Sequence, residues 1–157
     1  MSAIGQAIQT RSRHPIPFLI LSAVALTFAA GCAAAGGGTV KVTLQEWSVQ
    51  RDKVELPAGS ITFEVSNIGP DDVHEFVVIK TDLAPGSLPT DSTGSVDESG
   101  EGIDEVMGEI EDIAVGATGK LTLELAAGKY VLLCNIYSED ENEAHYHEGM
   151  RTDFTVN

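Results

Sequence analysis

Short segments with alternating apolar and polar residues follow one another from residue 39 to the end of the chain. A period of two places the apolar side chains on one face and is typical of half-buried strands. The segments with this alternation, or with a β-branched and aromatic composition, are 39–49, 53–56, 60–67, 73–80, 120–125, 130–135 and 151–156. Turn residues separate them, and no long helical stripe interrupts them. The pattern predicts an all-β sandwich or barrel.

One stretch departs from this pattern. Residues 81–112 are rich in Gly, Pro, Ser, Thr and carboxylates. We interpret 82–105 as a long acidic surface loop inserted between strands. A solvated loop needs no further role, and the functional alternatives are a docking surface or a second cation site. The spacing of the acids does not match an EF-hand loop.

The first residues have the features of an export signal. Arg11 and Arg13 supply a positive start, and 15–30 is an apolar run without charge. This run is short for a membrane-spanning helix, which needs about 20 apolar residues. We therefore predict that residues 1–31 are a signal peptide removed on export.

The end of this segment indicates attachment of a lipid. The sequence Ala-Ala-Gly before Cys32 resembles a bacterial lipobox, with Ala29 where Leu is usual. In that interpretation Cys32 becomes the lipidated N-terminus, and the lipid tethers the protein to a membrane without spanning it. Residues 32–38 would be a flexible linker. The alternative is an ordinary signal peptide cleaved near Ala35.

The remaining residues, 39–157, form one predicted domain, which is long enough for a single core of the sandwich type. The chain has 9 basic and 24 acidic residues. Two of the basic residues and none of the acidic ones lie within 1–31, so 7 basic residues face 24 acidic ones afterwards, a formal charge of −17. Such a charge disfavours nucleic acid and anionic lipid, and it favours a cationic partner or high solubility.

Cys134 is the only remaining thiol if Cys32 carries a lipid. Exported proteins occupy compartments that favour disulfides, so an unpaired thiol there needs an explanation. A disulfide with Cys32 is not expected, because Cys32 lies outside the strand pattern. A buried inert thiol, a reactive thiol and a metal ligand remain as interpretations.

The histidine and methionine residues of the domain favour the metal ligand. Three histidines follow the signal peptide, His74, His145 and His147, and Met150 comes directly after the last two. A thiolate, two imidazoles and a thioether are the ligand set of a blue-copper electron-transfer site. Cys134 ends one predicted strand and Met150 precedes the next, so a ligand loop between them would be held at both ends.

Two other chemistries fit these residues less well. Zinc accepts cysteine and two histidines, but a methionine adds nothing to a zinc site. A cysteine–histidine nucleophile is the enzyme alternative. Cys134 follows an apolar strand and no nucleophile signature surrounds it, so we expect a copper protein without enzymatic activity.

The residues around these ligands resemble the cupredoxin family over roughly residues 40–157. The segments that carry the resemblance are Asn67, Val73-His74-Glu75-Phe76-Val77, the run GKYVLLCN that ends with Cys134-Asn135, and the run HYHEGM from His145 to Met150. The resemblance implies a Greek-key β-sandwich, one copper ion and one-electron transfer. It also implies that His74, Cys134 and a downstream histidine are the equatorial ligands and that Met150 is the weak axial ligand.

The choice of the downstream histidine and one insertion remain to be decided. The family pattern His-Tyr-x-x-Gly-Met selects His145, and a tighter His-x-x-Met would select His147. Ten residues, 135–144, separate Cys134 from His145, where most relatives have two to four. This acidic insertion is expected to change the exposure or geometry of the site, or to stabilise Cu(II) and lower the reduction potential.

Together these features predict an exported copper electron carrier, anchored by lipid at the periplasmic or extracellular face of a membrane. Its expected partner is a redox protein with a basic docking surface, and nucleic acid is not expected to bind. The alternatives are a copper chaperone or store without electron transfer, and a metal-free interaction module with the same fold.

Overall fold

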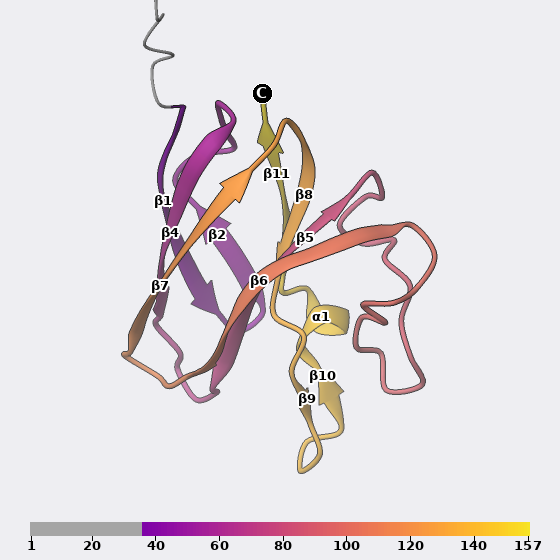
Figure 1. Cartoon of the computed structure of the whole chain (residues 1–157). Coiled ribbons are helices and arrows are strands. Elements are labelled where there is room, and N and C mark those ends of the chain that lie inside the picture. Colours follow the sequence, from indigo (N-terminus) through magenta and orange to yellow (C-terminus); the bar gives the residue numbers. More distant parts are fainter. Residues whose placement is uncertain (1–35) are drawn as a thin grey trace, which may run out of the picture. The chain divides into compact units, whose positions relative to one another are not determined.

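Two β-sheets packed face to face and one small hairpin make up the domain (Figure 1). The structure is a computed structural model and describes residues 36–157. The predicted signal peptide (1–31), the predicted lipid attachment at Cys32 and linker residues 33–35 lie outside the described residues. No helix within 36–157 is long and apolar enough to cross a membrane. The predicted all-β sandwich is confirmed.

The first sheet has the strand order β2-β1-β4-β7 and the second has the order β3-β11-β8-β5-β6. The first contains β1 (Gly37–Gln45), β2 (Ser48–Arg51), β4 (Gly59–Asn67) and β7 (Thr118–Leu125). The second contains β3 (Glu55–Leu56), β5 (His74–Thr81), β6 (Ile103–Ile113), β8 (Gly128–Leu133) and β11 (Arg151–Val156). The hairpin of β9 (Tyr137–Ser138) and β10 (Glu143–Ala144) leads into the short helix α1 (His145–Glu148).

The core lies between the two sheets and is formed by the alternating residues. The inward side chains of β1 and β4 are at most 1% exposed; they are Val40, Val42, Leu44, Ile61, Phe63 and Val65. From this sheet Phe63 contacts two rings of the second sheet, Phe76 at 5.3 Å and Phe154 at 5.7 Å between centroids. Burial of each large apolar side chain contributes about 1.5–3 kcal/mol, so the predicted apolar face accounts for the packing of the sheets.

Strand β1 begins two residues earlier than predicted, inside the expected linker. Gly37 and Gly38 pair in parallel with Ser60 and Ile61 of β4. The close approach requires glycine, because a Cβ on Gly37 would lie 2.0 Å from the carbonyl oxygen of Ser60, and its φ is +93°. A side chain at this position would therefore clash with the neighbouring backbone.

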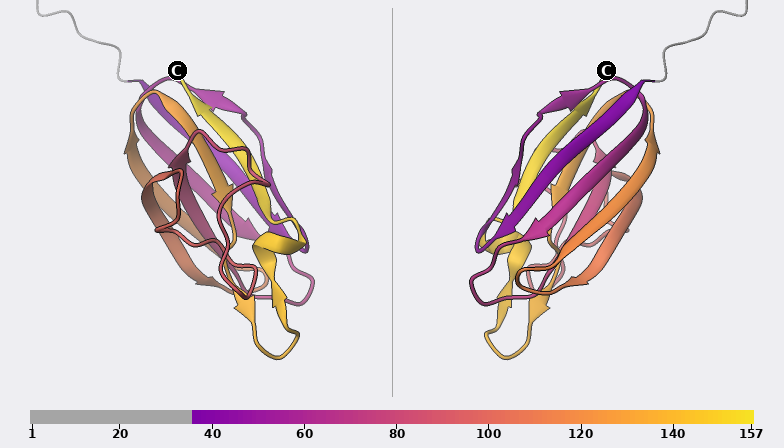
Figure 2. Two further views of the ribbon diagram at one scale, coloured as in Figure 1. Left: turned by 90° about the vertical axis from the view of Figure 1, so that its right-hand side faces the viewer. Right: turned by 90° about the vertical axis from the view of Figure 1, so that its left-hand side faces the viewer.

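The connection 82–102 between β5 and β6 covers the outer face of the second sheet (Figure 2). Leu88 and Val96 of this connection are buried in a second apolar cluster with Val77 and Val131 of the sheet. Residues 130–133 of β8 are consequently buried on both faces. The predicted acidic surface loop is thus packed along one side, and the carboxylates at Asp82, Asp91, Asp97 and Glu101 remain exposed on the other.

Strand β6 occupies a stretch in which the sequence showed no strand pattern. It is an edge strand paired only with β5, and its carboxylates are tolerated because one side of an edge strand faces solvent. Three register shifts interrupt the pairing of β5 and β6. Each shift changes which residues face the sheet, so the alternation that would identify the strand is broken.

Candidate metal centre

The four predicted ligands lie at one end of three neighbouring strands. His74 is the first residue of β5, Cys134 directly follows β8, and Met150 directly precedes β11. Strand β8 lies between β5 and β11 and runs antiparallel to both. The start of β5, the end of β8 and the start of β11 therefore meet at the same edge. His145 opens α1 in the loop between β8 and β11.

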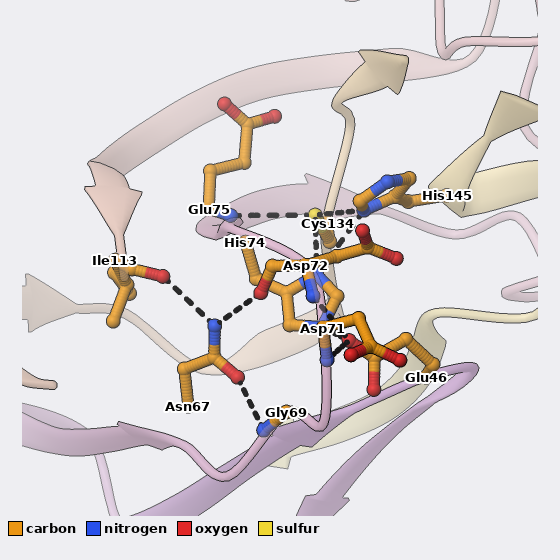
Figure 3. A network of polar contacts seen from close by, with 10 residues as sticks. All are labelled: Glu46, Asn67, Gly69, Asp71, Asp72, His74, Glu75, Ile113, Cys134 and His145. Carbon is orange, nitrogen blue, oxygen red and sulfur yellow. Dashed lines mark hydrogen bonds and ion pairs between the residues drawn. The ribbon is translucent and has the colours of Figure 1, made fainter. Parts of the chain in front are cut away.

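Three donor atoms converge at this edge (Figure 3). The Nδ1 atoms of His74 and His145 are 3.1 Å apart, and the Sγ of Cys134 lies 3.9 Å from the first and 3.4 Å from the second. Zinc takes the same donors at about 2.0–2.3 Å, and such donors around one tetrahedral ion are about 3.3–3.6 Å apart. The observed triangle matches this spacing to within a few tenths of an ångström. Within residues 36–157 it is the one group of His, Cys, Asp and Glu side chains placed to hold a metal.

Met150 is placed by the backbone of the same loop. The N–H of Met150 donates to the carbonyl of His145, and the N–H of Cys134 donates to the carbonyl of Met150, both at 3.0 Å. The Met150 side chain is fully buried in the main core, in the same cluster as Cys134. The geometry favours His145 over His147 as the second imidazole, because His145 is buried against Cys134 and His147 is exposed.

Burial sets the protonation of the donors. Burial, and next the proximity of His145, lower the pKa of His74, and burial likewise lowers the pKa of His145. Both imidazoles are therefore neutral at pH 7 and keep a lone pair for a metal. Burial raises the pKa of the Cys134 thiol to about 12, although the N–H of Glu75 opposes the rise. A thiolate in this site requires a bound cation, so metal binding must release the thiol proton.

Backbone and side-chain hydrogen bonds hold the ligand residues in place. The N–H of Glu75 points at the Cys134 sulfur at 3.3 Å, and the Glu75 carboxylate accepts the N–H of Asn135 at 2.8 Å. Burial raises the pKa of Glu75 to about 7, against the effect of that Asn135 bond. Sequence analysis did not identify this role of Glu75, because nothing local indicates that its carboxylate returns to the strand of Cys134.

Asn67 fixes the segment that leads into His74. Its side-chain NH₂ group donates to the carbonyls of Asp72 at 2.7 Å and Ile113 at 2.8 Å, and its oxygen accepts the N–H of Gly69 at 2.8 Å. These bonds join the turn before β5 to the end of β6 (Figure 3). Asn67 is 1% exposed, so the three bonds satisfy a side chain that water does not reach.

The acidic insertion 135–144 forms the β9–β10 hairpin, which extends from the ligand end (Figure 2). The His145 N–H donates to the carbonyl of Ile136 at 2.9 Å, so the base of the hairpin closes over this ligand. His145 is only 1% exposed. It lines a surface pocket together with Asp72, Val73, Asp112, Ile136 and Ser138. The insertion therefore covers His145, in keeping with the expectation that it changes the exposure of the site.

Comparison with known proteins identifies the fold. No family model and no curated protein sequence matches the chain. An auracyanin of the photosynthetic bacterium Roseiflexus castenholzii, reduced with dithionite, aligns with 20% identity and a TM-score of 0.52 over 77% of this chain and 96% of that one. A rusticyanin variant aligns with 18% identity and a TM-score of 0.53 over 76% of each chain.

These likenesses show that the chain has a cupredoxin fold, that of the blue copper proteins. On this fold the thiol of Cys134 and the imidazole nitrogens of His74 and His145 converge, and the thioether of Met150 is buried in the same cluster as Cys134. These are the donor types found in blue-copper sites.

Proposed function

We propose that this protein is a copper-binding electron carrier in which His74, Cys134, His145 and Met150 hold one copper ion. The observation that carries the proposal is the convergence of two imidazole nitrogens and a thiol sulfur, all buried, where the start of β5 and the end of β8 meet the loop that carries His145. When bound, copper supplies the one-electron chemistry by alternating between Cu(I) and Cu(II). Thiolate and thioether suit Cu(I), and imidazole suits both oxidation states.

The chain contributes a site that changes little between the two states. Backbone hydrogen bonds link Cys134 to Met150 and Met150 to His145, and His74 is the first residue of β5. The site excludes water because all four side chains are buried. Asn135, next to Cys134, also bonds both the N–H and the carbonyl of Val96 in the covering connection. A preorganised ligand set keeps the rearrangement on electron transfer small, which favours a carrier over a protein that releases its copper.

The partner we propose is a redox protein with a basic docking surface. Carboxylates crowd the end of the sandwich that holds the ligands, including Asp72 and Asp112 at the pocket that reaches His145. The turns at this same end carry three exposed apolar side chains, those of Ile68, Val73 and Val115. The turns are adjacent, because the N–H of Gly116 donates to the carbonyl of Asn67. Opposite charge would steer the encounter and an apolar centre would exclude water, and both support short-lived electron-transfer contacts.

Attachment to a membrane through Cys32 and export across it are also part of the proposal. Their support is the sequence alone, the apolar run followed by Ala-Ala-Gly-Cys. The test is incorporation of labelled fatty acid in a bacterial host, with Cys32→Ala as the control. Label and membrane association that disappear with the substitution support the anchor, and a freely secreted wild-type protein would refute it.

The copper site is tested by the visible spectrum of the chain from residue 33 on, after addition of one equivalent of Cu(II). We expect an intense thiolate-to-copper absorption that a mild reductant bleaches and an oxidant restores. Cys134→Ser should abolish the absorption. Absence of the band in the wild-type protein, with the Cys134 thiol still titratable, would refute copper binding. Ready transfer of Cu(I) to another apoprotein would favour a chaperone or store instead.

A further inference from the structure

Glu46 lies in the turn between β1 and β2, and its carboxylate is next to His74 (Figure 3). Its Oε1 accepts the backbone N–H of Asp72 at 2.8 Å and of Asp71 at 3.2 Å. The same oxygen lies 3.5 Å from the Nε2 of His74. The turn therefore contacts both the segment that leads into β5 and the imidazole with which β5 begins.

Two atoms at this contact are buried and have no hydrogen-bond partner within the described part of the chain. They are the Nε2 of His74 and the Oε2 of Glu46. Nearly all buried polar groups have a hydrogen-bond partner, so two unpartnered atoms side by side are unusual. Here one atom can donate and the other belongs to a carboxylate that accepts. A shift of about 0.5 Å would bring the Nε2 of His74 and the Oε1 of Glu46 into the normal hydrogen-bond range.

The orientation of the His74 ring decides where its proton must be. Its Nδ1 faces the donors of the site, 3.1 Å from the Nδ1 of His145. A nitrogen that binds a metal carries no proton, so a neutral metal-binding imidazole in this orientation has its proton on Nε2. The Nε2–H group then points toward Glu46.

The Glu46 carboxylate is anionic at neutral pH. Burial raises its pKa, but hydrogen bonds from backbone N–H groups, including those of Asp72 and Asp71, lower it by more, so the net shift is downward. A negative charge is thereby held next to an imidazole that is itself completely buried.

We propose that Glu46 is a positioning residue for His74. Its carboxylate accepts a hydrogen bond from the Nε2–H group of His74, leaves the Nδ1 atom of His74 free for the metal and stabilises Cu(II) relative to Cu(I). Carboxylates that bind the second nitrogen of a ligand histidine fix its tautomer and raise its basicity, and their loss typically changes metal affinity 10–100-fold. The redox part rests on the proposed function, whereas the tautomer part applies to the metal-free protein as well.

Two variants distinguish the effect of the Glu46–His74 contact from the effect of the surrounding negative charge. Glu46→Gln removes the charge and keeps an oxygen for the N–H groups of Asp71 and Asp72. Asp72→Asn is the matched control, because it removes one charge that acts on His74 and His145 only through space. Circular dichroism and thermal unfolding verify that each variant is folded before it is compared.

The first measurement is ¹⁵N NMR of the histidine rings in the metal-free protein. We expect His74 to carry its proton on Nε2 in the wild type, with a slowly exchanging signal that shifts in Glu46→Gln and is unchanged in Asp72→Asn. A His74 proton on Nδ1, or a signal that Glu46→Gln leaves unchanged, would overturn the assignment. This readout is independent of whether copper is the natural metal.

The second measurement is the reduction potential of the copper-loaded proteins. We expect Glu46→Gln to lower the affinity for Cu(II) relative to Cu(I) about tenfold, which raises a one-electron potential by about 59 mV. Asp72→Asn should produce a clearly smaller rise. Equal rises would show that only the overall field matters, and an unchanged or lower potential in Glu46→Gln would contradict the redox part.

Discussion

Replacing Asn135 with alanine should loosen the covering connection 82–102 from the ligand strand. The Oδ1 of Asn135 accepts the N–H of Val96 at 2.6 Å, and its Nδ2 donates to the Val96 carbonyl at 3.1 Å. The same Nδ2 donates to the carboxylate of Glu98 at 3.1 Å. Alanine removes all three bonds, and it leaves the backbone groups of a buried valine without their partners.

The expected loss follows from the count and the burial of these bonds. Each contributes about 1 kcal/mol net, and the bond to the charged Glu98 contributes somewhat more. Asn135 and Glu98 are half-buried, so water can replace part of what is lost. We therefore expect the free energy of unfolding to fall by about 2–3 kcal/mol.

The assay is urea unfolding of the metal-free protein, followed by the fluorescence of its single tryptophan, Trp47. The matched control is Ser99→Ala, which removes an exposed hydroxyl bond to Asp97 within the same connection. This control should change the stability by no more than about 0.5 kcal/mol. A loss below about 1 kcal/mol for Asn135→Ala, or one equal to that of Ser99→Ala, would refute the reasoning.

Three further predictions concern packing, pH and the ligand choice. Leu88→Ala should lower the unfolding free energy by about 2–4 kcal/mol, because it opens a cavity under the connection; a loss below 1 kcal/mol in urea unfolding would contradict this. Glu75 has a folded pKa raised to about 7 from 4.5, so the folded metal-free protein binds more protons than the unfolded chain between these values. Glu75 therefore lowers the stability as pH rises from about 4.5 to 7, whereas the lowered pKa values of His74 and His145 act in the opposite direction. Glu75→Gln should remove the Glu75 contribution, so that stability rises more steeply with pH than in the wild type; an identical pH dependence of the two proteins would exclude Glu75 as a cause. His145→Ala should abolish the copper absorption while His147→Ala keeps it, and the opposite result would reassign the ligand.

Much of the fold could be predicted because it follows from local patterns. The apolar faces of β1 and β4 have a period of two, and Val40, Val42, Ile61 and Phe63 are buried as the alternation requires. Strand β6 could not be predicted in this way. Its register shifts break the alternation, and its strand character depends on pairing with β5.

The residues of the candidate site could likewise be predicted only in part. Soft and imidazole donors at or next to the ends of predicted strands identified His74, Cys134 and Met150 from their type and order. The choice between His145 and His147 depends on which side chain turns into the core, and two residues of spacing do not decide that. Glu46 and Glu75 carry no local signal, because each acts on a residue far along the chain.

The sandwich class and the chemical nature of the site could be predicted from the sequence alone, because periodicity and donor type are properties of single segments. The tertiary structure is needed to show that the start of β5, the end of β8 and the beginning of α1 bring three donors together around one point. It also decided that the hairpin covers His145, that 82–102 is packed on the sheet, and that Glu46 lies beside His74. These features depend on which distant segments become neighbours, and burial then sets the protonation of the groups that meet there.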